Sequence, residues 1–491
     1  MEPLNLSKKF SLIDKYRATS PEGYQLLPFR FHRLKAEKYL IVNMVGEHVI
    51  CDKTTLKSLV SGDLDTQSKF YMDLQAKHFL FDDDSNVALD LLALKFRTKQ
   101  FPVAQFTSLH IFVVTLRCDY TCKYCQVSRR MEGDNSFDMD EDTAIKSLDL
   151  VFKSPSKAIK IEFQGGEPLL NFDLIKFVVL NALERNAIEK RELQFVITTN
   201  LSFVDENVLN FCSSNGVYIS TSLDGPEELH NQNRPKAGKD GYQKTIDGIS
   251  AVQNHIGVDA VSALMTTTER SLADPQIIVD EYVKNNLHSI FLRPISPYGF
   301  AVKTRQNEKY NIERWMDFFR TGLDYIIKIN TAGYFLVEQY TAIILQKILS
   351  PSNPGYVDLQ SPSGIGISVL VYNYDGDVYA SDESRMLKEM GDETFKLGNV
   401  HENNYEEILL HDTLLDALEI SLPESAPMCS DCGLVTYCGS DPVYHHATQG
   451  DFLGKKPLSF FCQKNMSVIE HIFELLESPE KRRILEGWVK C

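Results

Sequence analysis

Residues 110–125 read HIFVVTLRCDYTCKYC, an apolar run of strand length that leads into a polar loop with three cysteines. Cys118, Cys122 and Cys125 have the spacing C-x3-C-x2-C. Thiolates are soft ligands that suit iron–sulfur clusters or zinc. Three of them can hold three irons of a [4Fe–4S] cluster and leave the fourth iron for another ligand, whereas most electron-transfer clusters have four cysteines. The spacing alone also allows a zinc site with a distant fourth ligand, or buried cysteines.

Around this loop, apolar runs of strand length alternate with amphipathic helical segments. The predicted strands are 110–116, 159–164, 193–199, 217–222, 260–266 and 289–293, and the predicted helices between them are 140–152, 173–185, 205–213, 242–253 and 275–285. Such alternation is typical of parallel βαβ units. Six units do not close the usual eight-fold barrel, so we predict an α/β fold with a partial (β/α)6 barrel. Ligands of parallel sheets bind at the carboxyl ends of the strands, where the cysteine loop lies.

Two changes in pattern divide the chain into three predicted domains. Residues 1–104 predict a small α+β module, with strands at 24–34 and 39–51 and helices at 54–61, 67–77 and 87–98. Residues 105–349 contain the partial barrel and two further helices, at 311–330 and 337–349. After Ser350 the chain becomes rich in proline, serine and glycine, which marks the second boundary. Residues 350–491 then predict a hairpin at 368–379, a cysteine-rich segment and a helix at 468–476.

Composition limits the function classes. The chain has 491 residues and a formal net charge of -16, which argues against a nucleic-acid partner because such partners are bound by lysine and arginine. We see no signal peptide at the N-terminus and no run of about 18 apolar residues, so we expect a cytoplasmic protein without a membrane segment. In such a chain, clustered cysteines indicate metal or redox chemistry. Cys51 and Cys212 stand apart in apolar surroundings and predict buried, inert thiols, and Cys491 is terminal.

Three segments, each at the end of a predicted strand, together resemble the radical S-adenosylmethionine (SAM) superfamily. They are Cys118–Cys125, Gly165-Gly166-Glu167-Pro168 and Ser222-Leu223-Asp224-Gly225. The resemblance implies that the three cysteines bind a [4Fe–4S] cluster whose open iron chelates SAM. It also implies an oxidoreductase-type enzyme that cleaves SAM to a 5′-deoxyadenosyl radical, which abstracts a hydrogen atom.

The resemblance also assigns candidate SAM contacts. Glycines let a backbone approach a ligand closely, although a Gly-Pro pair is also an ordinary turn. A planar arginine fork suits a carboxylate, although a surface arginine without a role is the alternative. Leu292 is a candidate for the adenine pocket or a plain core residue. The implied contacts are Gly165, Gly166 and Glu167 near the SAM amino group, Ser222, Asp224 and Arg234 near its carboxylate, Thr199 and Asn200 near the ribose, and Tyr124 and Leu292 near adenine.

A second cysteine group, Cys429-x2-Cys432-x5-Cys438 with Cys462, supplies four thiolates for a closed [4Fe–4S] cluster or structural zinc. It resembles the C-terminal SPASM extension of radical SAM peptide maturases, which normally holds two auxiliary clusters. Ser363, Ser381 and Pro442 stand where that extension has three further cysteines, so we predict one auxiliary cluster. Asp382 follows Ser381, at the position of an aspartate proposed as the general base in anaerobic sulfatase maturases; a solvated loop aspartate is the alternative.

The chain also resembles HxsB, the family of radical SAM maturases of the His-Xaa-Ser system. It rests on residues 26–31, 126–129, 262–268, 292–300, 437–442 and 459–462. It implies a precursor peptide with His-Xaa-Ser repeats as the substrate, a possible second radical SAM partner protein, and an electron donor of flavodoxin or ferredoxin type. Residues 1–104 weakly resemble winged-helix modules that grip leader peptides, and a capping domain is the alternative. Sulfatase-maturase-like side-chain oxidation, thioether formation and carbon cross-linking remain open outcomes. A non-enzymatic zinc or electron-transfer protein remains the competing class.

Overall fold

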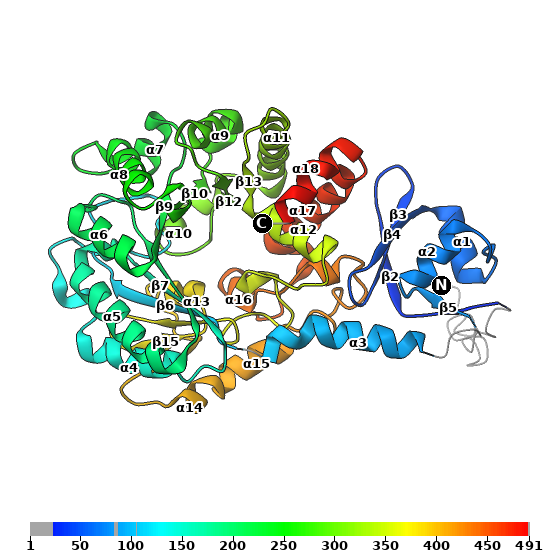
Figure 1. The fold of residues 1–491 in the computed structure, drawn as a ribbon, viewed down its shortest axis with the longest axis horizontal. Helices are drawn as coiled ribbons and strands as arrows, with labels where there is room; N and C mark the ends of the chain where they lie inside the picture. The colour runs from blue at the N-terminus through cyan, green and yellow to red at the C-terminus, as the bar shows by residue number, and fades with distance from the viewer. Residues whose placement is uncertain (1–22, 83–86, 105, 490–491) are drawn as a thin grey trace, which may run out of the picture. The chain divides into compact units, whose positions relative to one another are not determined.

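The computed structural model describes residues 23–82, 87–104 and 106–489. Its contacts divide the chain into two compact units, Met1–Gln100 with Asp431–Thr436 and Phe101–Ser430 with Tyr437–Cys491. Figure 1 labels helices and strands along the chain. The first stretch ends at Gln100, and the second unit contains residues 105–349 together with residues 350–491 apart from Asp431–Thr436. Among the described residues, no helix has the length and apolar character needed to cross a membrane.

The first unit is a small α+β module, as predicted. The strands β2 (Phe29–Arg33), β3 (Lys38–Asn43) and β4 (His48–Asp52) form an antiparallel sheet, and β1 (Gln25–Leu26) pairs with β5 (Leu80–Phe81). The predicted strand 39–51 is therefore a hairpin, because Asn43 begins a turn that Gly46 completes. The helices are α1 (Lys53–Ser61), α2 (Lys69–Ala76) and α3 (Ala88–Gln100). Leu59, Leu74 and Phe79 are fully buried in its core.

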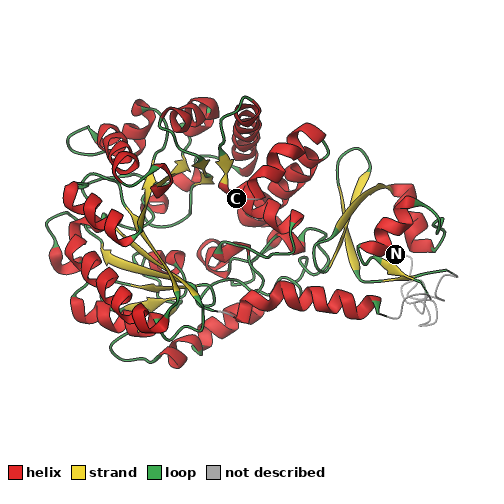
Figure 2. Cartoon of the chain, in the orientation of Figure 1, coloured by secondary structure: helices red, strands yellow, loops and turns green. Residues whose placement is uncertain are grey.

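The second unit is built on a nine-stranded sheet whose order is β12-β10-β9-β8-β7-β6-β14-β15-β16. From β12 to β14 all neighbours are parallel, which confirms the predicted partial barrel. Figure 2 shows these strands in yellow with helices in red around them. The parallel strands are β6 (Leu109–Thr115), β7 (Ala158–Gly165), β8 (Glu192–Thr198), β9 (Val217–Ser222), β10 (Val261–Thr267), β12 (Leu292–Pro294) and β14 (Val369–Tyr372).

The predicted helices of this unit are present, with ends shifted by at most four residues except in α17, which begins eight residues before the predicted start at 468. Their bounds are α4 (Glu141–Val151), α5 (Phe172–Glu189), α6 (Glu206–Asn215), α8 (Gly241–His255), α9 (Pro275–Lys284), α11 (Ile312–Thr331), α12 (Gln339–Leu349) and α17 (Phe460–Leu476). The sequence missed the short α7 (Glu227–Asn233) and α10 (Phe300–Lys303), and also α13 (Asp382–Lys388), α14 (Tyr405–Leu409), α15 (Asp412–Ile420), α16 (Pro442–Gln449) and α18 (Pro479–Val489).

The C-terminal hairpin joins the sheet of the barrel. β14 and β15 (Asp377–Tyr379) pair antiparallel, as the sequence predicted, and β16 (Lys396–Asn399) follows. On its other side, β14 pairs in parallel with β6, with Leu109 opposite Val369. α13 begins directly after β15, so its first residue, Asp382, is positioned by a strand of the same sheet that carries the cysteine loop.

Candidate active site

The three cysteines lie on the loop that follows β6, and this loop is held at several points. Arg117 forms two contacts of 2.7 Å with the carboxylate of Asp138. The backbone N–H of Cys118 donates to the carbonyl of Arg130 at 3.2 Å. The hydroxyl of Tyr120 donates to the carbonyl of Gly241 at 3.0 Å. Both sides of the C-x3-C-x2-C segment are thus fixed to the barrel.

The three thiols are half-buried and lie near one another. Burial, and next the charge of Cys122, raise the pKa of the Cys118 thiol. Burial raises the pKa of Cys122 to about 12, and the charge of Cys125 acts in the same direction. Throughout the part of the chain that the structure describes, no three cysteine, histidine or acidic side chains are already gathered around one metal position.

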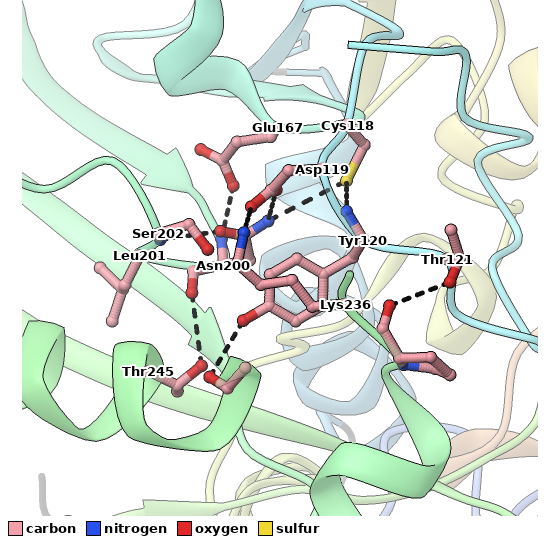
Figure 3. Close-up of polar contacts among 12 residues, drawn as sticks. Cys118, Asp119, Tyr120, Thr121, Glu167, Asn200, Leu201, Ser202, Lys236 and Thr245 are labelled. Carbon is pink, nitrogen blue, oxygen red and sulfur yellow. Dashed lines mark hydrogen bonds and ion pairs between the residues drawn. The ribbon is translucent and has the colours of Figure 1, made fainter. Parts of the chain in front are cut away.

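Asp119, between the first two cysteines, ties the loop to the rest of the barrel (Figure 3). Its carboxylate accepts a hydrogen bond from the side-chain amide of Asn200 at 2.8 Å and an ion pair from Lys236 at 2.6 Å. Asn200 was predicted as a ribose contact, and its amide instead bonds to the cysteine loop. Sequence reasoning missed Asp119 and Lys236, and the only signal available was the position of Asp119 inside the motif.

The segment Gly165–Glu167 packs tightly against the strand that precedes the cysteines. A Cβ on Gly165 would lie 1.9 Å from the carbonyl oxygen of Thr115, and one on Gly166 would lie 2.2 Å from that of Arg117. The backbone N–H of Gly166 donates to Thr115 at 2.8 Å, and that of Glu167 donates to Arg117 at 2.6 Å. Only glycine permits this approach, so both residues fix the geometry of the cysteine loop.

The carboxylate of Glu167 is fully buried and ties its own loop to the loop that follows β8. It accepts hydrogen bonds from the hydroxyl of Thr199 at 2.6 Å and from the backbone N–H groups of Asn200 at 2.7 Å and Leu169 at 3.0 Å. Burial raises its pKa to about 7 despite these donors. Glu167 and Thr199, both predicted as SAM contacts, therefore bond to each other in this structure.

Tyr124, Asp224 and Arg234 are brought together beside the cysteines. The hydroxyl of Tyr124 donates to Asp224 at 2.5 Å, and Nε of Arg234 lies 3.3 Å from the other oxygen of that carboxylate. The guanidinium of Arg234 lies 5.4 Å from the centre of the Tyr124 ring. Ser222 ends β9 opposite Leu264 of β10. This group supplies a carboxylate-binding arginine and an aromatic face at the carboxyl ends of the strands.

Leu292 is fully buried, and its side chain faces α11. A Cβ on Gly322 of that helix would lie 2.9 Å from Cδ1 of Leu292. This packing favours the core role that the sequence left open for Leu292 over a place in the adenine pocket.

Arg385 connects Asp382 to the loop that carries the cysteines. One guanidinium nitrogen of Arg385 donates to the carbonyl of Val127, two residues after Cys125, at 3.2 Å. Another lies 3.7 Å from Oδ1 of Asp382. Burial raises the pKa of Asp382 to about 7; Glu383 and Glu162 of β7 also raise it, while Arg385 and Arg293 of β12 lower it. The carboxylate therefore faces residues of the barrel, and its side chain is only 17% exposed.

The second cysteine group falls in both units, with Cys432 in the first and Cys429, Cys438 and Cys462 in the second. The side-chain amide of Asn465 donates to Sγ of Cys438 at 3.6 Å. Two of the three residues that replace the missing cysteines start helices. Ser381 caps α13 through a reciprocal bond with Ser384, and Pro442 is the first residue of α16. Cys51 and Cys212 are buried, as predicted, and Cys491 lies outside the described residues.

Residues 112–277 match the family model described as the radical SAM superfamily. The chain carries a radical SAM domain. This domain contains the cysteine loop, the glycine pair and the Tyr124–Asp224–Arg234 group. It makes the chain an enzyme, so the alternative of a non-enzymatic zinc or electron-transfer protein is set aside. Its family implies a [4Fe–4S] cluster and SAM.

Two relatives illustrate the extent of the similarity. An uncharacterized protein of Methanocaldococcus jannaschii is 32% identical over 146 residues, which cover 30% of this chain and less than half, 48%, of that protein. The serine-type anaerobic sulfatase-maturating enzyme of Bacteroides thetaiotaomicron is 20% identical over 389 residues, which cover 75% of this chain and 89% of that enzyme. The second alignment extends well beyond the radical SAM domain.

Solved structures share the fold. The structure of anSMEcpe with bound AdoMet and Cp18Cys peptide superimposes with a TM-score of 0.62 at 17% identity, and covers 78% of this chain and 99% of that one. Streptococcus suis SuiB bound to precursor peptide SuiA superimposes with a TM-score of 0.50 at 14% identity, and covers 84% of this chain and 94% of that one. At these identities the likeness establishes the α/β fold with its partial barrel.

The residues present fit the implied cofactors. Three thiols on one loop are the ligand set of a cluster with one open iron, and binding would release the protons that burial holds on Cys118 and Cys122. The guanidinium of Arg234 is half-buried and lies beside Asp224 and Tyr124, and an arginine fork suits the carboxylate of SAM.

Replacement of Gly166 by alanine tests the close packing behind the cysteines. We expect a lower melting temperature, about 1–3 kcal/mol of lost stability, because the new Cβ meets a backbone carbonyl that cannot move aside. We also expect SAM binding, measured by anaerobic calorimetry, to weaken at least about tenfold, since each 1.4 kcal/mol is tenfold in affinity. Gly133→Ala is the control, because a Cβ on Gly133 meets nothing within 4 Å. Equal SAM affinity of the two variants would contradict the role of Gly166.

Proposed function

We propose that this enzyme is a radical SAM maturase that removes a hydrogen atom from a ribosomally made precursor peptide and modifies one of its side chains. The link Val127–Arg385–Asp382, which brings a buried carboxylate beside the cysteine loop, is the observation that carries the proposal. The peptides named for the anSMEcpe and SuiB structures support a peptide substrate. The resemblance to HxsB supports a precursor of the His-Xaa-Ser repeat type.

In this proposal each residue has a defined task. Cys118, Cys122 and Cys125 hold the cluster, and Arg234 with the end of β9 holds the carboxylate of SAM. When bound, the cluster and SAM supply the 5′-deoxyadenosyl radical that takes a hydrogen atom from the substrate. Asp382 accepts the proton that the substrate side chain loses, and Arg385 keeps that carboxylate beside the cluster loop. The electron that remains on the substrate would pass to the auxiliary cluster assigned below.

We assign one auxiliary [4Fe–4S] cluster to Cys429, Cys432, Cys438 and Cys462. The hydrogen bond from Asn465 to Cys438 is of the kind that orients a cluster ligand and tunes its potential. The capping role of Ser381 and the helix-starting role of Pro442 support the view that the first auxiliary cluster of SPASM proteins has been replaced here by ordinary helix starts.

The proposal also places domain boundaries at 104/105 and 349/350 and gives residues 1–104 a leader-peptide or capping role. It further includes a second radical SAM protein as a possible partner and an electron donor of flavodoxin or ferredoxin type. Sulfatase-maturase-like oxidation of a side chain is the second candidate. The alignment over 389 residues with the Bacteroides enzyme favours it.

Hydrogen transfer from a labelled peptide tests the function directly. The reduced enzyme is incubated without air with SAM and His-Xaa-Ser repeat peptides whose serine or histidine carries deuterium on carbon. We expect 5′-deoxyadenosine that contains deuterium from one of the labelled residues, and a peptide of altered mass. A parallel reaction with a labelled sulfatase-type peptide tests the second candidate: deuterium transfer from that peptide alone would favour sulfatase-maturase-like oxidation. Unlabelled 5′-deoxyadenosine with unaltered peptides in every reaction would contradict peptide modification.

A further inference from the structure

The side-chain amide of Asn200 lies beside Cys118 and has no part in the steps proposed above (Figure 3). Its Nδ2 is 4.0 Å from Sγ of Cys118, at the outer limit of an N–H···S hydrogen bond. The backbone N–H of Tyr120 is 3.4 Å from the same sulfur. Among the residues that the structure describes, Asn200 is the one side chain that donates to a sulfur of residues 118–125. Sγ of Cys118 therefore receives N–H groups from two loops, its own and the one that follows β8.

Both ends of this amide are fixed, which sets the direction in which it donates. Oδ1 of Asn200 accepts the backbone N–H of Ser202 at 2.8 Å, and Nδ2 donates to Oδ1 of Asp119 at 2.8 Å. If the amide were turned over, it would lose the donor at Ser202 and place its oxygen against the carboxylate of Asp119. The two bonds therefore assign the nitrogen and the oxygen. Asp119 takes one of the two N–H groups, and the other is available to the sulfur of Cys118.

The backbone of Asn200 is held on both sides as well. Its N–H donates to the buried carboxylate of Glu167 at 2.7 Å, and its carbonyl accepts the hydroxyl of Thr245, on α8, at 3.4 Å. The amide is therefore in place beside Cys118 before any cluster binds. A donor that is already in place needs no reorganisation when the sulfur that it faces gains negative charge.

A lysine offsets the negative charge next to Cys118. The side chain of Asp119 is only 4% exposed, and Nζ of Lys236 lies 2.6 Å from its carboxylate. A buried carboxylate alone would oppose the addition of an electron to a cluster on the neighbouring cysteine, because nearby like charges disfavour each other. The ion pair with Lys236 reduces that effect. The network then presents the N–H of Asn200 to the sulfur as its main polar group.

We propose that Asn200 is a positioning residue for Cys118 and raises the reduction potential of the [4Fe–4S] cluster that the radical SAM family implies at this loop. Reduction adds negative charge to the cluster and to its ligand sulfurs, and an N–H directed at a sulfur stabilises that charge. Hydrogen bonds to the sulfurs are among the features that set the potentials of such clusters. The inference needs only the radical SAM domain, so it holds whatever the substrate is.

Potentiometric titration of the anaerobic holoenzyme, followed by electron paramagnetic resonance, measures this potential without SAM turnover. The cluster at Cys118 is the one whose reduced signal changes when SAM is added at the end. In Asn200→Ser the hydroxyl still accepts the N–H of Ser202, because serine forms the same kind of turn, and the donor to Cys118 is lost. We expect the ratio of reduced to oxidised cluster at a fixed potential to fall at least about threefold, equivalent to about 28 mV, since tenfold is 59 mV for one electron.

Asn200→Asp is the second variant and keeps the shape of the side chain. It should lower the potential further, because a carboxylate oxygen replaces the N–H group beside the sulfur. Asn215→Ser is the matched control. The amide of Asn215 donates to the carbonyl of Phe211 within α6 at 2.8 Å, at the end of the helix that leads into β9, and its loss should leave the potential unchanged.

Iron content and SAM affinity, measured on the same samples, separate this role from the ribose contact that the family resemblance implies for Asn200. We expect both Asn200 variants to keep their iron, because the three thiols are unchanged, and to bind SAM within about threefold of the wild type. A fall of less than threefold in Asn200→Ser, a potential that rises in either variant, or loss of iron from both would overturn the inference. SAM binding that weakens more than about tenfold at an unchanged potential would assign Asn200 to SAM instead.

Discussion

The Cys118/Cys122/Cys125→Ala variant is expected to produce no 5′-deoxyadenosine from SAM under reduction, a loss of more than roughly 1,000-fold, because the reduced cluster carries the chemistry that the protein alone lacks. Iron content should fall in parallel. We expect about eight irons per wild-type chain and about four in the variant, since the auxiliary cysteines are unchanged. Anaerobic iron and sulfide analysis with chromatographic detection of 5′-deoxyadenosine measures both.

The matched control for this variant is Cys212→Ala, which removes a buried cysteine that burial keeps protonated. It should retain both the iron and the SAM cleavage of the wild type. A wild-type protein with zinc in place of iron, or a triple variant that still cleaves SAM, would contradict the assignment of the three cysteines.

Asp382→Asn is expected to slow peptide modification by roughly 100- to 10,000-fold, the usual range for a general base. SAM binding should change little, because the amide keeps the shape of the carboxylate. The measurement is the rate of change in peptide mass, with SAM affinity determined on the same samples. Asp416→Asn, on the exposed side of α15, is the control and should behave as the wild type.

The pH dependence of the same reaction provides an independent check. Burial raises the pKa of Asp382 to about 7, so the carboxylate, which is the basic form, becomes populated as the pH rises through about 7. Wild-type modification should therefore be slow at about pH 6 and reach a plateau above about pH 8. The rate of the Asp382→Asn variant should not rise with pH in this way. A variant rate within twofold of the wild type, or a wild-type rate that falls with rising pH, would exclude Asp382 as the base.

The sequence predicted the parallel strands well because their apolar residues are either continuous, as in β6, or alternate with less buried positions, as in β7, β9 and β10. The last strand was wrong in detail. Phe291 interrupts it and separates β11 (Ser289–Ile290) from β12, and the Phe291 ring stacks 5.7 Å from those of Tyr340 and Tyr356. Such contacts join residues from distant parts of the chain, and a local pattern carries no sign of them.

At the candidate site, too, the sequence predicted positions along the chain and missed contacts between distant residues. Motif spacing was enough to place Cys118, Gly166 and Arg234 at the carboxyl ends of their strands. It gave no indication that Asn200 and Lys236 both bond to Asp119, or that Arg385 connects Asp382 to Val127. These contacts depend on loop conformations after folding, in which a side chain finds a partner that sequence distance does not predict.

The pairing of β14 with β6 has a consequence for how this enzyme is made. Strand β6 has one neighbour, β7, that is synthesised soon after it. Its other edge stays open until residues 369–372 leave the ribosome and form β14. An unpaired edge in an apolar strand invites association with other chains, and contacts between distant parts of a chain form slowly. The nascent barrel therefore depends on its own C-terminal region for protection. Since the loop that follows β6 carries the three cysteines, cluster insertion is expected to follow the completion of translation.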